Sequence, residues 1–235
     1  MRLSFKSKEE SNRTSDIVVE QLSSFILKNN IFLGGTISIL AEWKMHIEPE
    51  SIEEIVKNES IFENDIKKNE KYKEFIELLK DFYSGDDDKV NERRGRLLEI
   101  LWDRVGVFDK NYKDCEKVTE AQVYDKGNKI SEKDIDIVYF NENKDQIKKE
   151  FIELHECKSS AKSTLRTPLR DRHRLKLELM KETKSIADKE KIMCDAYIIT
   201  FEFNTRNARR ILDRYQFNTI KIITGSDITQ RICNI

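Results

Sequence analysis

In the first third of the chain, apolar residues recur every three to four positions, which is the period of an α-helix. This spacing predicts helices over residues 16–28 and 70–83. Between them, Ser51 is followed three residues later by Glu54, the pattern of a capping box that opens a short helix. We therefore predict that the N-terminal region is a set of helices.

The polar run Ser84-Gly-Asp-Asp-Asp88 interrupts this helical pattern. Clusters of Gly and Asp are typical of turns and loops between regular elements. We place a domain boundary here, between a helical N-terminal extension (residues 1–85) and a C-terminal domain (residues 86–235).

After the boundary, helical spacing alternates with short apolar runs bounded by turn residues, as strands are. The pattern predicts helices over 89–105, 168–184 and 205–214, strands over 121–124, 135–140, 151–158, 196–201 and 220–224, and a last helix capped by Asp227. The order from residue 89 is α-β-β-β-α-β-α-β. Such an order indicates an α/β fold with a mixed sheet and helices on both of its faces.

Composition narrows the class of protein. Hydrophobic residues make up 38% of the chain, and no run approaches the roughly 18 consecutive apolar residues that cross a membrane. The first residues contain no apolar segment of a signal peptide. The four Cys residues are far apart with no Cys-x-x-Cys pair, which argues against a zinc ribbon or a disulfide scaffold. We therefore expect a cytoplasmic protein with no membrane partner.

The near-neutral total charge hides two regions of opposite charge. The chain has 43 Lys and Arg against 44 Asp and Glu. Residues 48–88 contain 14 acidic residues against 6 Lys, whereas residues 158–184 contain 9 basic residues against 3 acidic ones. A second basic cluster follows, made of Arg206, Arg209, Arg210 and Arg214. Basic regions of this size are typical of surfaces that bind a polyanion, and a solvated helix face is the alternative.

The charged residues of two neighbouring predicted strands can form a metal site. Asp134 and Asp136 are two residues apart and share one face of a strand, and the same holds for Glu156 and Lys158. A turn between the strands would bring the carboxylates together across a hairpin. Two carboxylates, with the carbonyl of Cys157 between them, suit a hard divalent cation such as Mg²⁺. Since a lysine beside such a cation can orient a water and neutralise charge on a phosphate, the pattern indicates metal-assisted phosphodiester hydrolysis.

Glu-x-Lys alone is a weak signal in so charged a chain, because it also occurs at Glu42, Glu142 and Glu182. Glu142 lies in a predicted turn, Glu182 lies on a predicted helix where positions i and i+2 diverge, and Glu42 has no upstream strand acid. Only Glu156 combines a strand, an upstream strand acid and a following basic helix. A structural cross-strand salt bridge is the alternative for this set. The neighbouring His155 is predicted to face the other side of the sheet.

Asp136, Glu156 and Lys158, together with the order of the elements, resemble the PD-(D/E)XK nuclease superfamily over residues 86–230. The segment from Arg94 to Glu99 is similar to the first core helix of that family, where a Glu is a further metal ligand. The alternative for Glu99 is a solvent-facing helix residue that pairs with Arg96. The proline of the family signature is replaced by Ile135, a common departure.

The end of the chain resembles a narrower group, the nuclease half of CRISPR-associated effectors that are activated by cyclic oligoadenylate. The resemblance concerns residues 196–200, 206–210 and 222–228. Those effectors carry a Rossmann-like sensor domain before the nuclease. Residues 1–84 are too short and too helical for that sensor, so the activation mechanism does not carry over.

The resemblance implies a restriction-endonuclease-like αβββαβ core and an endonuclease that uses Mg²⁺ or Mn²⁺ to hydrolyse phosphodiester bonds in DNA, with RNA as the second substrate class. It implies metal ligands at Asp136, Glu156, Glu99 and the carbonyl of Cys157, with Lys158 orienting the attacking water. It also implies that the region after Lys158 contacts nucleic acid, with a solvated helix face as the alternative and, for Ser159, the capping of a helix or turn. The residues concerned are Ser159, Arg170, Arg172, His173 and Arg174.

The same resemblance favours a role in prokaryotic antiviral defence. Nucleases that cut both strands commonly act as two-fold dimers, so we expect a homodimer. The alternative is a nuclease-fold subunit or nucleic-acid-binding module that is active only with a partner, in repair or mobile-element processing. The N-terminal helices, residues 1–85, would then be the adaptor.

Overall fold

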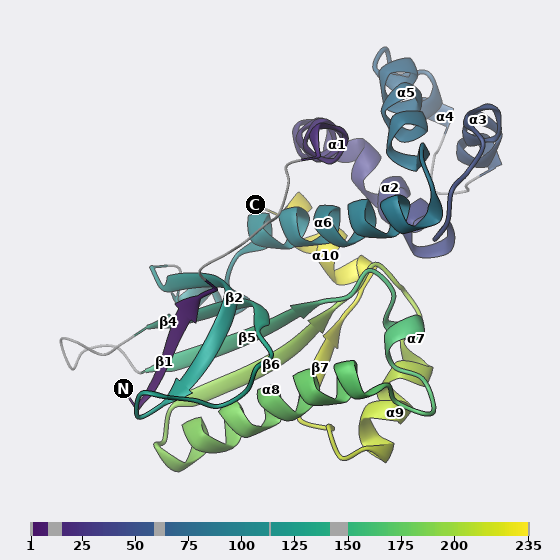
Figure 1. The fold of residues 1–235 in the computed structure, drawn as a ribbon. Coiled ribbons are helices and arrows are strands. Elements are labelled where there is room, and N and C mark those ends of the chain that lie inside the picture. Colours follow the sequence, from purple (N-terminus) through teal and green to yellow (C-terminus); the bar gives the residue numbers. More distant parts are fainter. Residues whose placement is uncertain (1, 9–15, 59–63, 113, 142–149, 235) are drawn as a thin grey trace.

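The computed structural model describes residues 2–8, 16–58, 64–112, 114–141 and 150–234 (Figure 1). Within these residues the chain forms an α/β fold around a seven-stranded sheet. The strands are β1 (Leu3–Ser7), β2 (Glu116–Asp125), β3 (Asn128–Lys129), β4 (Ile135–Asn141), β5 (Phe151–Cys157), β6 (Met193–Ile199) and β7 (Ile220–Ile223). Their order across the sheet is β1-β2-β4-β5-β6-β7, and β3 pairs with β2. Pairs from β1 to β5 are antiparallel and pairs from β5 to β7 are parallel, which confirms the predicted α/β class and mixed sheet.

The helices are α1 (Ile17–Lys28), α2 (Leu33–Glu42), α3 (Pro49–Asn58), α4 (Asn64–Lys67), α5 (Tyr72–Tyr83), α6 (Asp87–Val105), α7 (Ala161–Thr164), α8 (Asp171–Lys189), α9 (Arg206–Arg214) and α10 (Gly225–Cys233), with 3₁₀ turns at Asn30–Phe32 and Lys110–Tyr112. Helices α7, α8 and α9 cover one face of the sheet, α6 and α10 cover the other, and α1 to α5 lie beyond α6 (Figure 1). No single helix in the described part of the chain is long and apolar enough to cross a bilayer. The segments Ile17–Lys28 and Asn30–Glu42 reach the necessary length and hydropathy only when they are counted together, and the chain bends by 107° between them.

Strand β5 lies in the interior of the sheet, and all seven of its residues are buried. Its odd-numbered residues Phe151 and Cys157 belong to the apolar core under α6, whereas Ile152 and Leu154 belong to the core under α8. This alternation follows from the pleat, which points successive side chains to opposite faces. Whether a polar residue of β5 faces α6 or α8 therefore depends on whether its number is odd or even.

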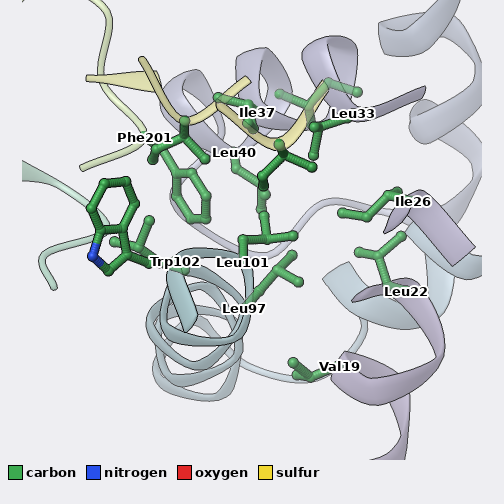
Figure 2. Packing of buried hydrophobic residues seen from close by; sticks show 14 of the residues in the cluster. Val19, Leu22, Ile26, Leu33, Ile37, Leu40, Leu97, Leu101, Trp102 and Phe201 are labelled. Carbon is green, nitrogen blue, oxygen red and sulfur yellow. The ribbon is translucent and has the colours of Figure 1, made fainter. Parts of the chain in front are cut away.

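The N-terminal helices share one apolar core with the sheet (Figure 2). Leu22 of α1, Leu40 of α2 and Trp102 of α6 are buried in it, as is Phe201 after β6. Each such side chain contributes roughly 1.5–3 kcal/mol when it is fully buried. Gly225 allows the close approach of α10, because a Cβ there would meet the Phe201 carbonyl. The core thus continues across the predicted boundary near residue 85.

Two local expectations for the N-terminal region are corrected. The region is not purely helical, because β1 pairs with the edge of β2 and Arg2 pairs with Asp125 at 2.6 Å. Leu3 and Phe5 are buried by this pairing. Two apolar residues among polar neighbours are too few to predict a strand from the sequence. Helix α3 begins at Pro49 rather than at Ser51, since proline is well suited to the first turn of a helix.

Candidate active site

The hairpin of β4 and β5 brings Asp136 and Glu156 together. In this antiparallel pair Ile137 lies opposite His155, so one further step along each strand aligns Asp136 with Glu156 on the face covered by α8. Here the Asp136 side chain takes part in the pairing, because its Oδ2 accepts the backbone N–H of Cys157 at 2.7 Å. The structure therefore contains the two adjacent carboxylates that the hairpin pattern predicts.

Two lysines bridge these carboxylates. Lys158, directly after β5, has its Nζ 2.5 Å from Glu156 Oε1 and 3.7 Å from Asp136 Oδ2. Lys176 of α8 has its Nζ 2.8 Å from the same Glu156 oxygen and 3.1 Å from Asp136 Oδ1. Glu156 is only 2% exposed, so solvent and salt screen these ion pairs weakly. Four charged side chains converge at the carboxyl end of β5, and we call them the four-charge cluster.

The members of the four-charge cluster stabilise one another's ionised forms. Burial alone would raise the pKa of Asp136, but the positive charges of Lys158 and Lys176 outweigh burial and hold that pKa below its ordinary value. Burial alone would lower the pKa of Lys158, but Glu156 and Asp136 outweigh it and raise that pKa. Asp136 is therefore a carboxylate and Lys158 an ammonium group near neutral pH.

Both oxygens of Glu156 lack a hydrogen bond of regular geometry among the described residues, although Oε1 forms close ion pairs. Both ion pairs of Glu156 are made by Oε1, and the buried Oε2 has no donor in this part of the chain. A buried acceptor without a donor costs about 1–3 kcal/mol. A cation bound at this oxygen would remove that cost.

The residues present fit a divalent cation of the Mg²⁺ type. Such an ion is commonly held by one or two carboxylates and keeps several water ligands. Asp136 and Glu156 can supply the carboxylates, and the carbonyl of Cys157, the residue after Glu156, accepts a hydrogen bond from Lys158 Nζ at 3.1 Å. Among the described residues no group of three or more His, Cys, Asp or Glu side chains is arranged to hold a metal ion. Binding would therefore depend on backbone and water oxygens as well.

Lys176 is the residue of this site that sequence reasoning missed. Its only signal in the sequence is its place in the basic region, three residues after His173 on the same helix. Its Nζ also lies 3.4 Å from Oδ1 of Asp134, two residues before Asp136 in the chain. Asp134 is more exposed than Asp136 and lies 3.8 Å from Lys8 Nζ. It forms the outer rim of the cluster.

Glu99 reaches the same end of β5 from the opposite face of the sheet. It lies on α6, its carboxylate is 3.3 Å from Arg96, and it lines a cavity of about 820 Å³ between α1 and α6. The Cys157 thiol belongs to this face as well. Burial, together with the charges of Asp136 and Glu99, raises the pKa of that thiol well above its ordinary value. The thiol therefore stays protonated, and the role of Glu99 as a metal ligand stays a prediction.

His155 points away from the four-charge cluster, as the alternation predicts, and belongs to a separate buried network. Its Nδ1 accepts the indole N–H of Trp102 at 2.7 Å, and its Nε2 lies 3.0 Å from Glu153 Oε2. Glu153 also accepts the backbone N–H groups of Phe108 at 2.7 Å and Asp109 at 2.9 Å. This network joins β5 to α6 and to the turn that follows it.

The predicted nucleic-acid-binding arginines differ in their surroundings. Arg170 and Arg172 are exposed and have no carboxylate partner within the residues that the structure describes. Arg174 is engaged on its own helix, 3.0 Å from Asp171 and 3.0 Å from Glu178. Two of the three arginines therefore present to the solvent guanidinium groups that have no carboxylate partner.

His173 and Ser159 lie closer to the four-charge cluster. Burial and the positive charges of Arg172, Lys158 and Lys176 lower the pKa of His173 to about 4. His173 is therefore neutral at pH 7, and its Nε2 accepts a hydrogen bond from Arg172 at 3.2 Å. The Ser159 carbonyl accepts a hydrogen bond from Arg94 of α6 at 3.3 Å, so the chain after Lys158 is anchored to the other layer of the fold.

The N-terminal helices also help to fix the segment after Lys158. Lys44, which follows α2, donates to Ser160 Oγ at 2.9 Å and to Glu202 Oε1 at 2.7 Å. Ser160 in turn caps α7 by accepting the N–H of Ser163 at 3.2 Å. The Glu42-x-Lys44 sequence is thus part of a structural contact, and its Lys44 supports the loop beside the cluster.

The three residues of the nuclease-like signature, Asp136, Glu156 and Lys158, are therefore adjacent in space, and Lys176 joins them. The exposed arginines of α8 lie on the same side of the sheet. A comparison of the chain with protein-family models and with curated proteins finds no match.

Proposed function

We propose that this protein is a divalent-metal-dependent endonuclease with a restriction-endonuclease-like core. It would hydrolyse phosphodiester bonds in DNA, with RNA as the second substrate class, in prokaryotic antiviral defence. The observation that carries the proposal is the buried convergence of Asp136, Glu156 and Lys158. The element order α6-β2-β4-β5-α8-β6, with α6 and α8 on opposite faces of the sheet, also supports it.

The chain's own residues prepare the site for phosphodiester hydrolysis. Asp136 is held in place by the Cys157 N–H and is ionised, so it is a preorganised cation ligand. Glu156 offers a second, buried carboxylate, and neither of its oxygens accepts a hydrogen bond of regular geometry from the described residues. A bound Mg²⁺ or Mn²⁺ would supply Lewis-acid stabilisation of a phosphate oxygen and acidify a water. Lys158, as an ammonium group, orients the attacking water and donates to a phosphate oxygen as negative charge develops.

Exposed cations beside the four-charge cluster support a polyanionic substrate. The segment 158–170 contains no acidic residue and exposes Lys162, Arg166 and Arg170. Helix α9 continues this surface, since Arg214 donates to Thr167 Oγ1 at 3.1 Å. Unpaired guanidinium groups of this kind bind phosphate oxygens bidentately. The affinity for nucleic acid should therefore fall steeply as the salt concentration rises.

The direct test is cleavage of a panel of supercoiled, linear and single-stranded DNA and of RNA, with Mg²⁺, Mn²⁺ or a chelator. We expect metal-dependent cleavage by the wild-type protein and its loss in Asp136→Ala and Lys158→Ala. The control is Lys189→Ala, at the far end of α8, which should cleave as the wild type does. Circular dichroism establishes that each variant is folded. Full activity in either folded site variant would exclude the assignment.

Exposed apolar residues between helices α2 and α3 favour a second candidate, a nuclease-fold subunit or nucleic-acid-binding module that acts only with a partner, in repair or mobile-element processing. Trp43 is 40% exposed and Met45 59%, and Trp43 lines a cavity of about 630 Å³ with His46 and Ile55. Light scattering after size exclusion measures the mass of the protein alone. A homodimer that cleaves unaided would support the first candidate, and an inactive monomer would support the second.

A further inference from the structure

We propose that the Lys176 ammonium group takes the role of a second cation, so that the site binds one divalent cation per chain. The proposal rests on the proposed metal-dependent function, because it concerns how many ions that function uses. It assigns a positioning role in the cation site to a residue outside the Asp-Glu-x-Lys pattern.

The contacts of Lys176 are those expected of a bridging cation. Its Nζ lies 2.8 Å from Glu156, 3.1 Å from Asp136 and 3.4 Å from Asp134, and its side chain is 20% exposed. A second metal ion on the α8 face would need carboxylates from this same set, because Glu99 lies on the opposite face and pairs with Arg96. Since Lys176 already joins all three acidic residues, a second ion would have to displace it.

The packing of α8 fixes Lys176 in this position. The following residues Leu177, Leu179 and Met180 are buried in the core between α8 and the sheet. The backbone of Lys176 therefore cannot withdraw without breaking apolar contacts. Its aliphatic stem passes along the interior while the ammonium group reaches the carboxylates.

The charge of the site also favours one ion. Asp134, Asp136 and Glu156 carry three negative charges, and Lys158 and Lys176 carry two positive ones, which leaves one net negative charge. One divalent ion changes this to one net positive charge, which a phosphodiester then cancels. A second divalent ion would leave an excess of positive charge in a largely buried site, and buried uncompensated charge is costly. Counting Lys8 at the exposed rim of Asp134 would only increase that excess.

The hydrogen bonds of the carboxylates also favour one divalent ion per chain. Lys158 and Lys176 share Glu156 Oε1, and Asp136 Oδ2 accepts the Cys157 N–H. Both oxygens of Glu156 lack a hydrogen bond of regular geometry in the described part of the chain, but Oε1 already lies against two ammonium groups, which leaves Oε2 as the position open to an ion. One such oxygen provides a point of entry for one ion.

The test is the stoichiometry of Mn²⁺ binding, measured by isothermal titration calorimetry and by counting unbound Mn²⁺ with electron paramagnetic resonance. We expect one ion per chain for the wild type and two for Lys176→Met. Lys176→Arg, which keeps the charge, should bind one. The matched control is Lys181→Met, the same change on an exposed face of α8, and it should also bind one.

The outcomes separate this proposal from the proposed function. Two ions in the wild type, or one ion in Lys176→Met, would overturn the role of Lys176 and leave the metal-dependent function standing. No Mn²⁺ uptake by the wild type would overturn both. If Lys176→Met does not fold, the wild-type and Lys176→Arg stoichiometries still decide, because two ions in either contradict the proposal.

Discussion

Glu153 and Glu156 are three residues apart on β5 and each is 2% exposed, yet their surroundings differ completely. Glu153, on the α6 face, accepts hydrogen bonds from two backbone N–H groups and lies 3.0 Å from the His155 ring. Glu156, on the α8 face, has two ammonium groups at one oxygen and no donor at the other within the described residues. Burial alone therefore does not distinguish a structural carboxylate from a chemically available one.

The difference lies in the partners of each carboxylate. The indole N–H of Trp102 can only donate, so His155 Nδ1 must accept, and the neutral ring then carries its proton on Nε2 and donates to Glu153. Along the contacts from Trp102 through His155 to Glu153, each polar atom is therefore a defined donor or acceptor. Hydrogen-bond networks of this kind stabilise one conformation. The α8 face instead holds the ammonium groups of Lys158 and Lys176 against a carboxylate whose Oε2 has no donor in the described part of the chain. We infer that the α6 face supports the strand and the α8 face carries the chemistry.

Glu156→Gln should produce the largest effect on the α8 face. The substitution keeps the shape of the side chain and removes its charge, so the site loses a cation ligand and a partner of Lys158. Metal-dependent cleavage should fall by about 100- to 1,000-fold. Single-turnover kinetics on the folded variant measures this loss. Activity within a factor of two of the wild type would remove Glu156 from the chemistry.

On the α6 face, His155→Leu should have the largest effect on stability. It leaves the Trp102 indole N–H without its acceptor and takes one donor from Glu153, and the expected cost is about 2–4 kcal/mol of unfolding free energy. Urea denaturation followed by fluorescence measures it. His155→Gln, which can both accept and donate, is the matched control and should lose less. Equal stability of the Leu variant and the wild type would contradict the proposed role of the network.

Glu153→Gln should have a smaller effect of the same kind. The amide replaces one acceptor oxygen by a donor, which then faces a backbone N–H or the His155 N–H, at an expected cost of about 1–3 kcal/mol. Cleavage per folded molecule should remain at the wild-type level, in contrast to Glu156→Gln. A variant that is stable but inactive would show that the two faces are not separate in function.

The smallest expected effect is a dependence of stability on pH. Burial lowers the pKa of His155 despite the opposing influence of Glu153, so the unfolded chain binds its proton more readily than the folded protein does. The contribution of the neutral ring is complete above the unfolded pKa of about 6.5 and is lost as the pH falls below that value. Unfolding free energies at pH 7.5 and 5.5 should therefore differ more for the wild type than for His155→Gln. If the unfolding free energy changed equally between the two pH values in the wild type and in His155→Gln, the pH dependence would come from other groups.

The strand part of the site could be predicted from the sequence because it depends on local rules. Alternation along a strand is enough to put Glu156 and Lys158 on one face and His155 on the other. Antiparallel pairing is then enough to bring Asp136 beside Glu156. The predicted element order also agrees with α6, β2, β4, β5, α8, β6, α9 and β7.

The parts that could not be predicted depend on long-range packing. Which residue of α8 reaches the carboxylates is set by the rotation of that helix on the sheet, so Lys176 could not be chosen over its basic neighbours. For the same reason the sequence does not tell from which face Glu99 approaches β5. Strand β1 was missed because its partner, β2, lies more than a hundred residues further along the chain.

The position of β1 has a consequence for how the chain is made. Leu3 pairs with Asp125, so during synthesis β1 emerges 122 residues before its partner. At about 5–20 residues per second, it waits roughly 6–25 s for β2. In that interval the N-terminal helices can form while the strand stays unpaired. Shortened versions that begin after residue 85 would lose β1, and the uncovered edge of β2 would then be open to pairing between molecules.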